Sequence, residues 1–103
     1  MGLKTLVVYD IPDDRTRTKV FETCKDYGLA HIQYSAFFGP LNQNRRQELY
    51  QRLRRVLGDK EGKIIICPIC DKDLALLLEI AVPEEAAVRQ ADGAKGGGGP
   101  LIY

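Results

Sequence analysis

The chain has 103 residues, with 15 Lys and Arg, 14 Asp and Glu, and a formal net charge of +1 at pH 7. This length fits one domain, and the near-balance of charges excludes a protein whose overall charge alone would attract nucleic acid. The 3 cysteines, an odd number, argue against a disulfide framework and for a reducing compartment. We expect a cytoplasmic protein without membrane contact, because no run is apolar enough to span a bilayer and no signal-peptide pattern is present.

The first predicted element is a strand over Leu3 to Tyr9, a largely β-branched and aromatic run typical of a strand covered on both faces. The strand runs into Asp10, and Pro12 ends it because a central strand cannot use a residue without an N–H. A strand that ends on Asp holds a carboxylate rigidly at the rim of the sheet, where a divalent metal can be presented to a phosphate.

A first helix follows, with Asp13 or Asp14 as its cap and Gly28 as its stop. Its apolar face is formed by Val20, Phe21, Cys24 and Tyr27. Cations in the first turns oppose the helix dipole, which indicates that they serve a partner. These cations are Arg15, Arg17 and Lys19.

The residues from His31 to Phe38 predict one long strand, with a break near Tyr34-Ser35 as the alternative. Gly39-Pro40 then predicts a bend. Asn42 or Asn44 caps a second helix that ends at Gly58 and has its apolar stripe at Leu49, Leu53, Val56 and Leu57. Its other faces are strongly basic and carry Arg45, Arg46, Arg52, Arg54 and Arg55.

A third buried strand is predicted over Ile64 to Cys67 and halted at Pro68. Residues 71–73 suggest a turn, and the periodicity of 74–80 fits either a helix or a strand. After Pro83 come a weak helix over 84–90, a glycine-rich tether over 94–99, and an apolar tip over Leu101 to Tyr103. This tip is either a docking strand or a frayed tail.

Strands that alternate with two helices in so short a chain predict an α+β two-layer sandwich with both helices on one face. The other face of the sheet then needs a cover, and a second copy of the chain is the simplest one.

Asp10 is either a metal ligand or an ordinary strand-end carboxylate, and Asp13 and Asp14 are better explained as caps. One carboxylate holds Mg²⁺ poorly, so a two-fold axis would have to supply Asp10 from a partner. The metal would then polarise a phosphoryl oxygen and activate a water for attack on a phosphodiester.

Three further patterns have a functional and a structural interpretation. Cys67-Pro68-Ile69-Cys70 matches a redox pair or half of a zinc site, with only Cys24 and His31 left to complete the latter, and core packing is the simpler explanation. His31 is a candidate general base or an ordinary hydrogen-bonded histidine. The aromatic residues Tyr34, Phe37 and Phe38 either stack on bases or belong to the core.

The order of three segments resembles the small CRISPR-associated adaptation endonuclease family, the smaller of the two spacer-acquisition proteins. The segments are Val8 to Asp14, then Arg17, Lys19 and Tyr27-Gly28-Leu29, then Ile32 to Phe37, and Ile66 to Cys70 resembles the late strand and turn of the family. The resemblance covers residues 3 to about 82, and its departure from the pattern is the long segment 84–99.

The resemblance implies a ferredoxin-like antiparallel sheet over 1–82, a homodimer, and a tail over 83–103 whose last strand joins the partner's sheet. It also implies that the ribbon from His31 to Leu41 is two strands. Asp10 then corresponds to the Mg²⁺ or Mn²⁺ ligand at the dimer axis, and Tyr9, Arg17 and Phe37 to positions associated with catalysis.

Two functions follow. The first is a metal-dependent endonuclease for RNA or DNA, in which Arg15, Arg17 and Lys19 guide the nucleic acid toward Asp10. The second is a non-catalytic scaffold that bridges CRISPR integrase dimers and grips DNA phosphates with the arginines of the second helix.

Overall fold

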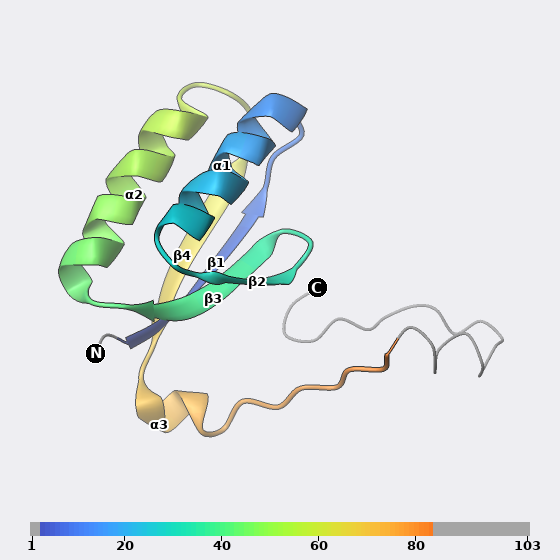
Figure 1. Ribbon diagram of the computed structural model, residues 1–103, viewed down its shortest axis with the longest axis vertical. Helices are drawn as coiled ribbons and strands as arrows, with labels where there is room; N and C mark the ends of the chain where they lie inside the picture. The colour runs from blue at the N-terminus through green and yellow to red at the C-terminus, as the bar shows by residue number, and fades with distance from the viewer. Residues whose placement is uncertain (1–2, 84–103) are drawn as a thin grey trace, which may run out of the picture.

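The computed structural model describes residues 3–83 (Figure 1). The elements in chain order are β1 (Leu3–Asp10), α1 (Asp14–Asp26), β2 (Ala30–Gln33), β3 (Ala36–Leu41), α2 (Gln43–Leu57), β4 (Lys63–Ile69) and the short α3 (Asp71–Leu74). The strands form one sheet in the order β2-β3-β1-β4, and every pairing is antiparallel. This is the ferredoxin-like α+β arrangement that the resemblance implied.

Helices α1 and α2 lie side by side on one face of the sheet (Figure 1). The core between the two layers is closed by Val7 and Phe37 from the sheet and by Val20, Leu49 and Leu53 from the helices, all at most 1% exposed. The predicted sandwich with both helices on one face is therefore confirmed. None of the helices within residues 3–83 is both long enough and apolar enough to cross a bilayer.

Both helices start with a side-chain cap that the sequence limited to two candidates. The carboxylate of Asp13 accepts a hydrogen bond from the Thr16 amide at 2.9 Å, and the side chain of Asn42 accepts one from the Arg45 amide at 2.8 Å. Each bond satisfies an otherwise free donor of the first turn. After α1, Gly28 takes a φ of +80°, which explains why the helix stops there.

The prediction of one continuous strand from His31 to Phe38 is wrong. The chain reverses at Tyr34-Ser35, so β2 and β3 form a hairpin with a register shift between His31 and Gln33. No glycine or proline marks this turn in the sequence, and the two strands implied by the resemblance are confirmed.

Two prolines predicted to interrupt strands lie inside them. Pro40 belongs to β3, beyond the point where β2 starts opposite Phe38, so β3 has a neighbour on only one side there. Pro68 belongs to β4, which is an edge strand. At both places the strand has no neighbour on one side. The N–H that proline lacks would point to that side, so no carbonyl group of a neighbouring strand loses a hydrogen bond.

The segment after β4 also differs from its prediction. Residues 71–73, predicted as a turn, belong to α3, and residues 75–80 form neither a helix nor a strand. The predicted helix over 84–90, the tether and the tip at Leu101 to Tyr103 lie outside the described residues. The boundary between a 1–82 domain and an 83–103 tail therefore stays a prediction.

The face of the sheet opposite α1 and α2, here called the helix-free face, carries several apolar side chains. Alternation along β1 sends Thr5, Val7 and Tyr9 toward the helices and leaves the residues between them on the opposite face. The pairing register places Leu6 between Phe38 and Cys67, and Val8 between Ala36 and Ile65. Ile65 is 50% exposed, so this face presents unburied apolar side chains.

Candidate nucleic-acid cleavage site

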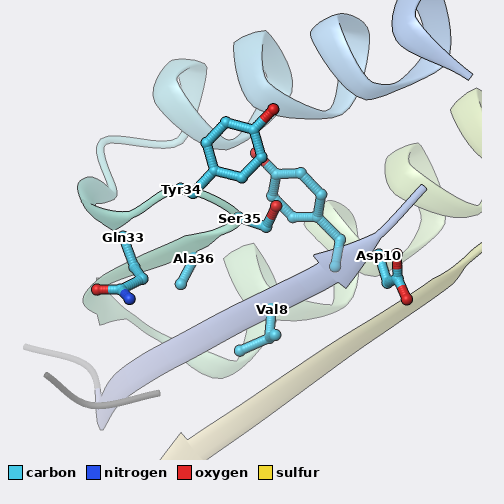
Figure 2. Close-up of a pocket in the computed structure, with 7 residues that line it drawn as sticks. Val8, Asp10, Gln33, Tyr34, Ser35 and Ala36 are labelled. Carbon is cyan, nitrogen blue, oxygen red and sulfur yellow. The ribbon is translucent and has the colours of Figure 1, made fainter. Parts of the chain in front are cut away.

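Asp10 is the last residue of the central strand β1 and is exposed to solvent. It lines a cavity of about 380 Å³ together with residues of β1 and of the β2–β3 hairpin (Figure 2). The wall comprises Val8, Tyr9, Asp10, Gln33, Tyr34, Ser35 and Ala36. By strand alternation the Asp10 side chain belongs to the helix-free face, together with Val8 and Leu6.

A backbone bond fixes the hairpin turn beside Asp10. The Tyr9 amide donates to the Ser35 carbonyl oxygen at 3.1 Å, which ties the turn to the end of β1. Gln33 and Ser35 thereby become wall residues of the Asp10 cavity, although the sequence analysis did not single them out. Residue types gave no signal for these two wall residues, because the turn at Tyr34-Ser35 contains no glycine or proline.

Arg17 is held rigidly at the start of α1. Its guanidinium donates to the Ile11 carbonyl oxygen at 2.8 Å and to the Pro12 carbonyl oxygen at 3.3 Å, and it forms an ion pair with Asp14. The hydrogen bond with Asp14 raises the pKa of Arg17. These contacts account for a cation at the start of α1 without invoking a binding partner. The argument from the helix dipole alone had indicated such a partner.

Tyr9 and Phe37 lie mostly beneath the surface of the site. Tyr9 is 4% exposed, and burial is the main cause that raises its pKa to about 12, while Arg17 acts in the opposite direction. Tyr9 is therefore a neutral phenol that can donate a hydrogen bond at physiological pH. Phe37 is fully buried, with its ring centroid 6.4 Å from that of Tyr9, so it affects the site by packing.

The other aromatic candidates divide between the two faces. His31 and Tyr34 are exposed on the hairpin, whereas Phe38 is half-buried on the helix-free face. The ring of His31 packs between Phe21 and Phe37, with both centroid distances at 4.9 Å. His31 is thus anchored to the core by its ring faces and edges while remaining accessible.

The basic residues lie on both helices and differ in their surroundings. Arg15 and Lys19 are exposed on α1. On α2, the guanidinium carbons of Arg45 and Arg52 lie 4.3 and 5.6 Å from the ring centroid of Tyr27. Arg46 is half-buried and donates to the Leu41 carbonyl oxygen at 3.0 Å. The other two cations, Arg54 and Arg55, are exposed in the last turn, where they also complement the helix dipole.

The described part of one chain does not supply a complete metal site. Within residues 3–83 no three or more His, Cys, Asp or Glu side chains gather at a position that suits an ion. Cys67 and Cys70 are exposed and Cys24 is buried in the core, so the three thiols do not form one metal-binding group in the described part of the chain. Asp10 is an oxygen ligand of the type that Mg²⁺ and Mn²⁺ prefer, and a second carboxylate has to come from elsewhere.

The described chain thus combines a ferredoxin-like sheet that ends in the exposed carboxylate of Asp10 with a restrained Arg17. Tyr9 and Tyr34 line both the Asp10 cavity and the neighbouring hollow that Arg17 lines. The family model described as CRISPR associated protein Cas2 matches residues 3–75. The chain belongs to this Cas2 family, as the resemblance in the sequence suggested.

Relatives of known name agree with this assignment. The chain is 62% identical to "CRISPR-associated endoribonuclease Cas2" of Desulforudis audaxviator over 82% of this chain and 84% of that protein. It is 46% identical to the protein of the same name from Korarchaeum cryptofilum over 77% and 85% of the two chains. A solved structure of a hypothetical protein from Thermus thermophilus matches with a TM-score of 0.63 and 29% identity, covering 81% of this chain and 92% of that one.

Proposed function

We propose that this protein is a metal-dependent endoribonuclease of CRISPR adaptation that works as a homodimer. The observation that carries the proposal is the position of Asp10, exposed at the end of the central strand and on the same face of the sheet as Leu6 and Val8. The relatives named as endoribonucleases support RNA as the substrate.

Two unsatisfied features of the described chain support the dimer. The helix-free face exposes apolar side chains, and the edge strand β4 has one side without a neighbour among residues 3–83. Residues 76–82 add an exposed apolar segment that includes Leu76, Leu78 and Ile80, each at least 73% exposed. We propose that a second copy covers the open face and that this segment takes part in the contact.

A second copy of the chain that covers this face symmetrically brings its own Asp10. The two Asp10 carboxylates would together hold one Mg²⁺ or Mn²⁺ ion, because the described residues of one copy offer too few ligands. When bound, the ion supplies Lewis-acid polarisation of a phosphoryl oxygen and lowers the pKa of a coordinated water.

The chain itself positions the substrate. Arg17, fixed by two carbonyl groups and Asp14, presents a cation to the phosphodiester, and the neutral phenol of Tyr9 donates a hydrogen bond near the same wall. Arg15 and Lys19 extend the positive surface along α1. The exposed arginines of α2 add phosphate contacts that also suit binding to DNA.

The test compares wild-type protein with Asp10→Asn on labelled RNA and DNA, with Mg²⁺, Mn²⁺ or a chelator. Because the metal contributes several kcal/mol of charge stabilisation, Asp10→Asn and the chelator should each lower cleavage by about 100-fold or more while the dimer persists. Asp26→Asn, an exposed carboxylate at the far end of α1, is the matched control and should cleave normally. Equal cleavage by Asp10→Asn and wild type would refute the nuclease proposal.

A further inference from the structure

A second cavity of about 180 Å³ lies between α1 and the β2–β3 hairpin, next to the Asp10 cavity. Its wall consists of Tyr9, Arg17, Thr18, Phe21, His31 and Tyr34. Tyr9 and Tyr34 also line the Asp10 cavity, so the two hollows share these rings as a partition. A molecule that occupies both hollows must therefore pass over Tyr34.

The floor of the second cavity is an ordered set of aromatic rings. Phe21 meets His31 edge to face at 4.9 Å and Phe37 at 5.2 Å, and His31 tilts over Phe37 at 4.9 Å. The Nε2 atom of His31 lies 3.3 Å from the Tyr34 carbonyl oxygen, which links the ring to the hairpin turn. Because Phe37 is fully buried, this cluster is built on the rigid core.

Tyr34 is an exposed part of the wall. Its side chain is 78% exposed on the two-residue turn, above the Asp10 cavity in Figure 2. A single exposed tyrosine needs no explanation, but this one separates an acidic hollow from an aromatic and basic one. Its ring thus offers a flat apolar surface on the wall of the cavity that Asp10 also lines.

The charges of the second cavity define the chemistry of its ligand. Its lining residues include the cation of Arg17 and the imidazole of His31 and no carboxylate. Carbonyl groups and Asp14 hold the guanidinium in place, which leaves part of its donor fork for a ligand. At about 180 Å³, the cavity has room for one small planar ring system.

We infer that this cavity is a subsite for an unpaired nucleobase, which stacks on Tyr34 while the adjoining phosphate lies at Asp10. The inference rests on the proposed function and adds that the substrate must be unstacked beside the scissile bond. Single-stranded RNA, a loop or a frayed end meets this requirement, and a continuous duplex does not.

The experiment measures stacking separately from cleavage. Full-length Asp10→Asn protein, with chelator present, is titrated into a single-stranded RNA that carries one 2-aminopurine, and both anisotropy and base fluorescence are recorded. Stacking should quench the fluorescence. Adding Tyr34→Ala should abolish the quench and weaken binding by about 5- to 150-fold, the effect of one base–aromatic contact. Tyr34→Phe should retain both signals.

Tyr50→Ala is the matched control, since Tyr50 is an exposed tyrosine on α2 outside both cavities. It should bind and quench normally, and a duplex of the same sequence should bind without the quench. Equal quenching by the Tyr34→Ala and parent proteins would overturn the subsite. That result would not bear on the role of Asp10 in cleavage. Conversely, cleavage that does not depend on Asp10 would refute the nuclease proposal but not the stacking of a base on Tyr34.

Discussion

Gly62 lies against Ile11 at the end of β1, and the contact leaves no room for a side chain. A Cβ atom at Gly62 would lie 3.0 Å from Cγ1 of Ile11 and 3.3 Å from the carbonyl oxygen of Asp10. The loop before β4 therefore packs directly on the backbone that carries the proposed metal ligand, and the strand end is fixed from both sides.

Gly62→Ala should destabilise the protein by about 1–3 kcal/mol, because the added methyl overpacks this contact. The corresponding loss in Tm is about 4–8 °C for each kcal/mol in a domain of this size. Thermal unfolding followed by circular dichroism measures the change. Gly28→Asn is the control, since Gly28 has a φ of +80° with nothing near its Cβ position and asparagine tolerates this conformation. Equal Tm values for both variants would contradict the close packing.

Asp13→Ala should lower stability at neutral pH, with the difference vanishing in acid. Hydrogen bonds from the hydroxyl and then the amide of Thr16 lower the pKa of Asp13 in the folded state. Because the pKa of Asp13 is lower in the folded than in the unfolded protein, its ionised carboxylate stabilises the fold at pH values above the unfolded-state pKa. This stabilisation is lost as the pH falls through the folded-state pKa. Tm measured from pH 7 down to pH 2 for both proteins checks this, and a constant difference over the whole range would rule out the carboxylate as the cause.

The exposed and the buried thiols should differ in reactivity. Burial raises the pKa of Cys24 to about 12, so its thiolate is scarce at pH 8 and its side chain is inaccessible. Cys70 is exposed and should react rapidly with a thiol reagent, whereas Cys24 should react only after unfolding. Mass spectrometry after timed labelling identifies each site, and early modification of Cys24 would show that the core opens there.

Leu78→Glu combined with Ile80→Glu should convert the dimer into a monomer. Both side chains are at least 78% exposed in the described chain, and an interface would have to bury the new charges. Sedimentation velocity gives the mass of each variant. Lys72→Glu, an exposed residue of α3, is the control and should remain dimeric. A dimer that survives the double substitution would exclude this segment from the contact.

Replacing Arg52, Arg54 and Arg55 with Ala should weaken RNA binding and flatten its salt dependence. Each phosphate contact contributes about 0.7 to the slope of log K against log salt for single strands, so three lost contacts change the slope by about 2. Arg46→Ala should instead lower Tm, because Arg46 donates to the Leu41 carbonyl oxygen. An unchanged slope in the triple variant would show that these arginines do not touch the backbone.

The layered fold was predictable because local signals agree with each other. The apolar strand before Asp10, the capped helices and their stripes at Val20, Leu49 and Leu53 all specify one sandwich. The hairpin at Tyr34-Ser35 was not predictable from residue types, since its turn has no glycine or proline and its register depends on pairing with β1. Pro40 and Pro68 were misjudged because their tolerance depends on which neighbours the strands have.

The site was predictable only in part, for a similar reason. Asp10 could be singled out because a strand end fixes its side chain in space. The restraint of Arg17 by Ile11 and Asp14, and the burial of Phe37, depend on tertiary contacts that residue spacing does not reveal. The partition is formed by Tyr9 and Tyr34, two residues that are 25 positions apart in the chain.

The composition of β4 bears on how newly synthesised copies behave before they meet a partner. Ile64, Ile65 and Ile66 are consecutive β-branched residues on an edge strand, a pattern that favours amyloid-like self-association. Lys63 and Pro68 bracket this run and leave four residues between them, fewer than the six or seven that a steric zipper uses. We therefore expect Lys63 and Pro68 to limit the aggregation of newly synthesised chains through this strand.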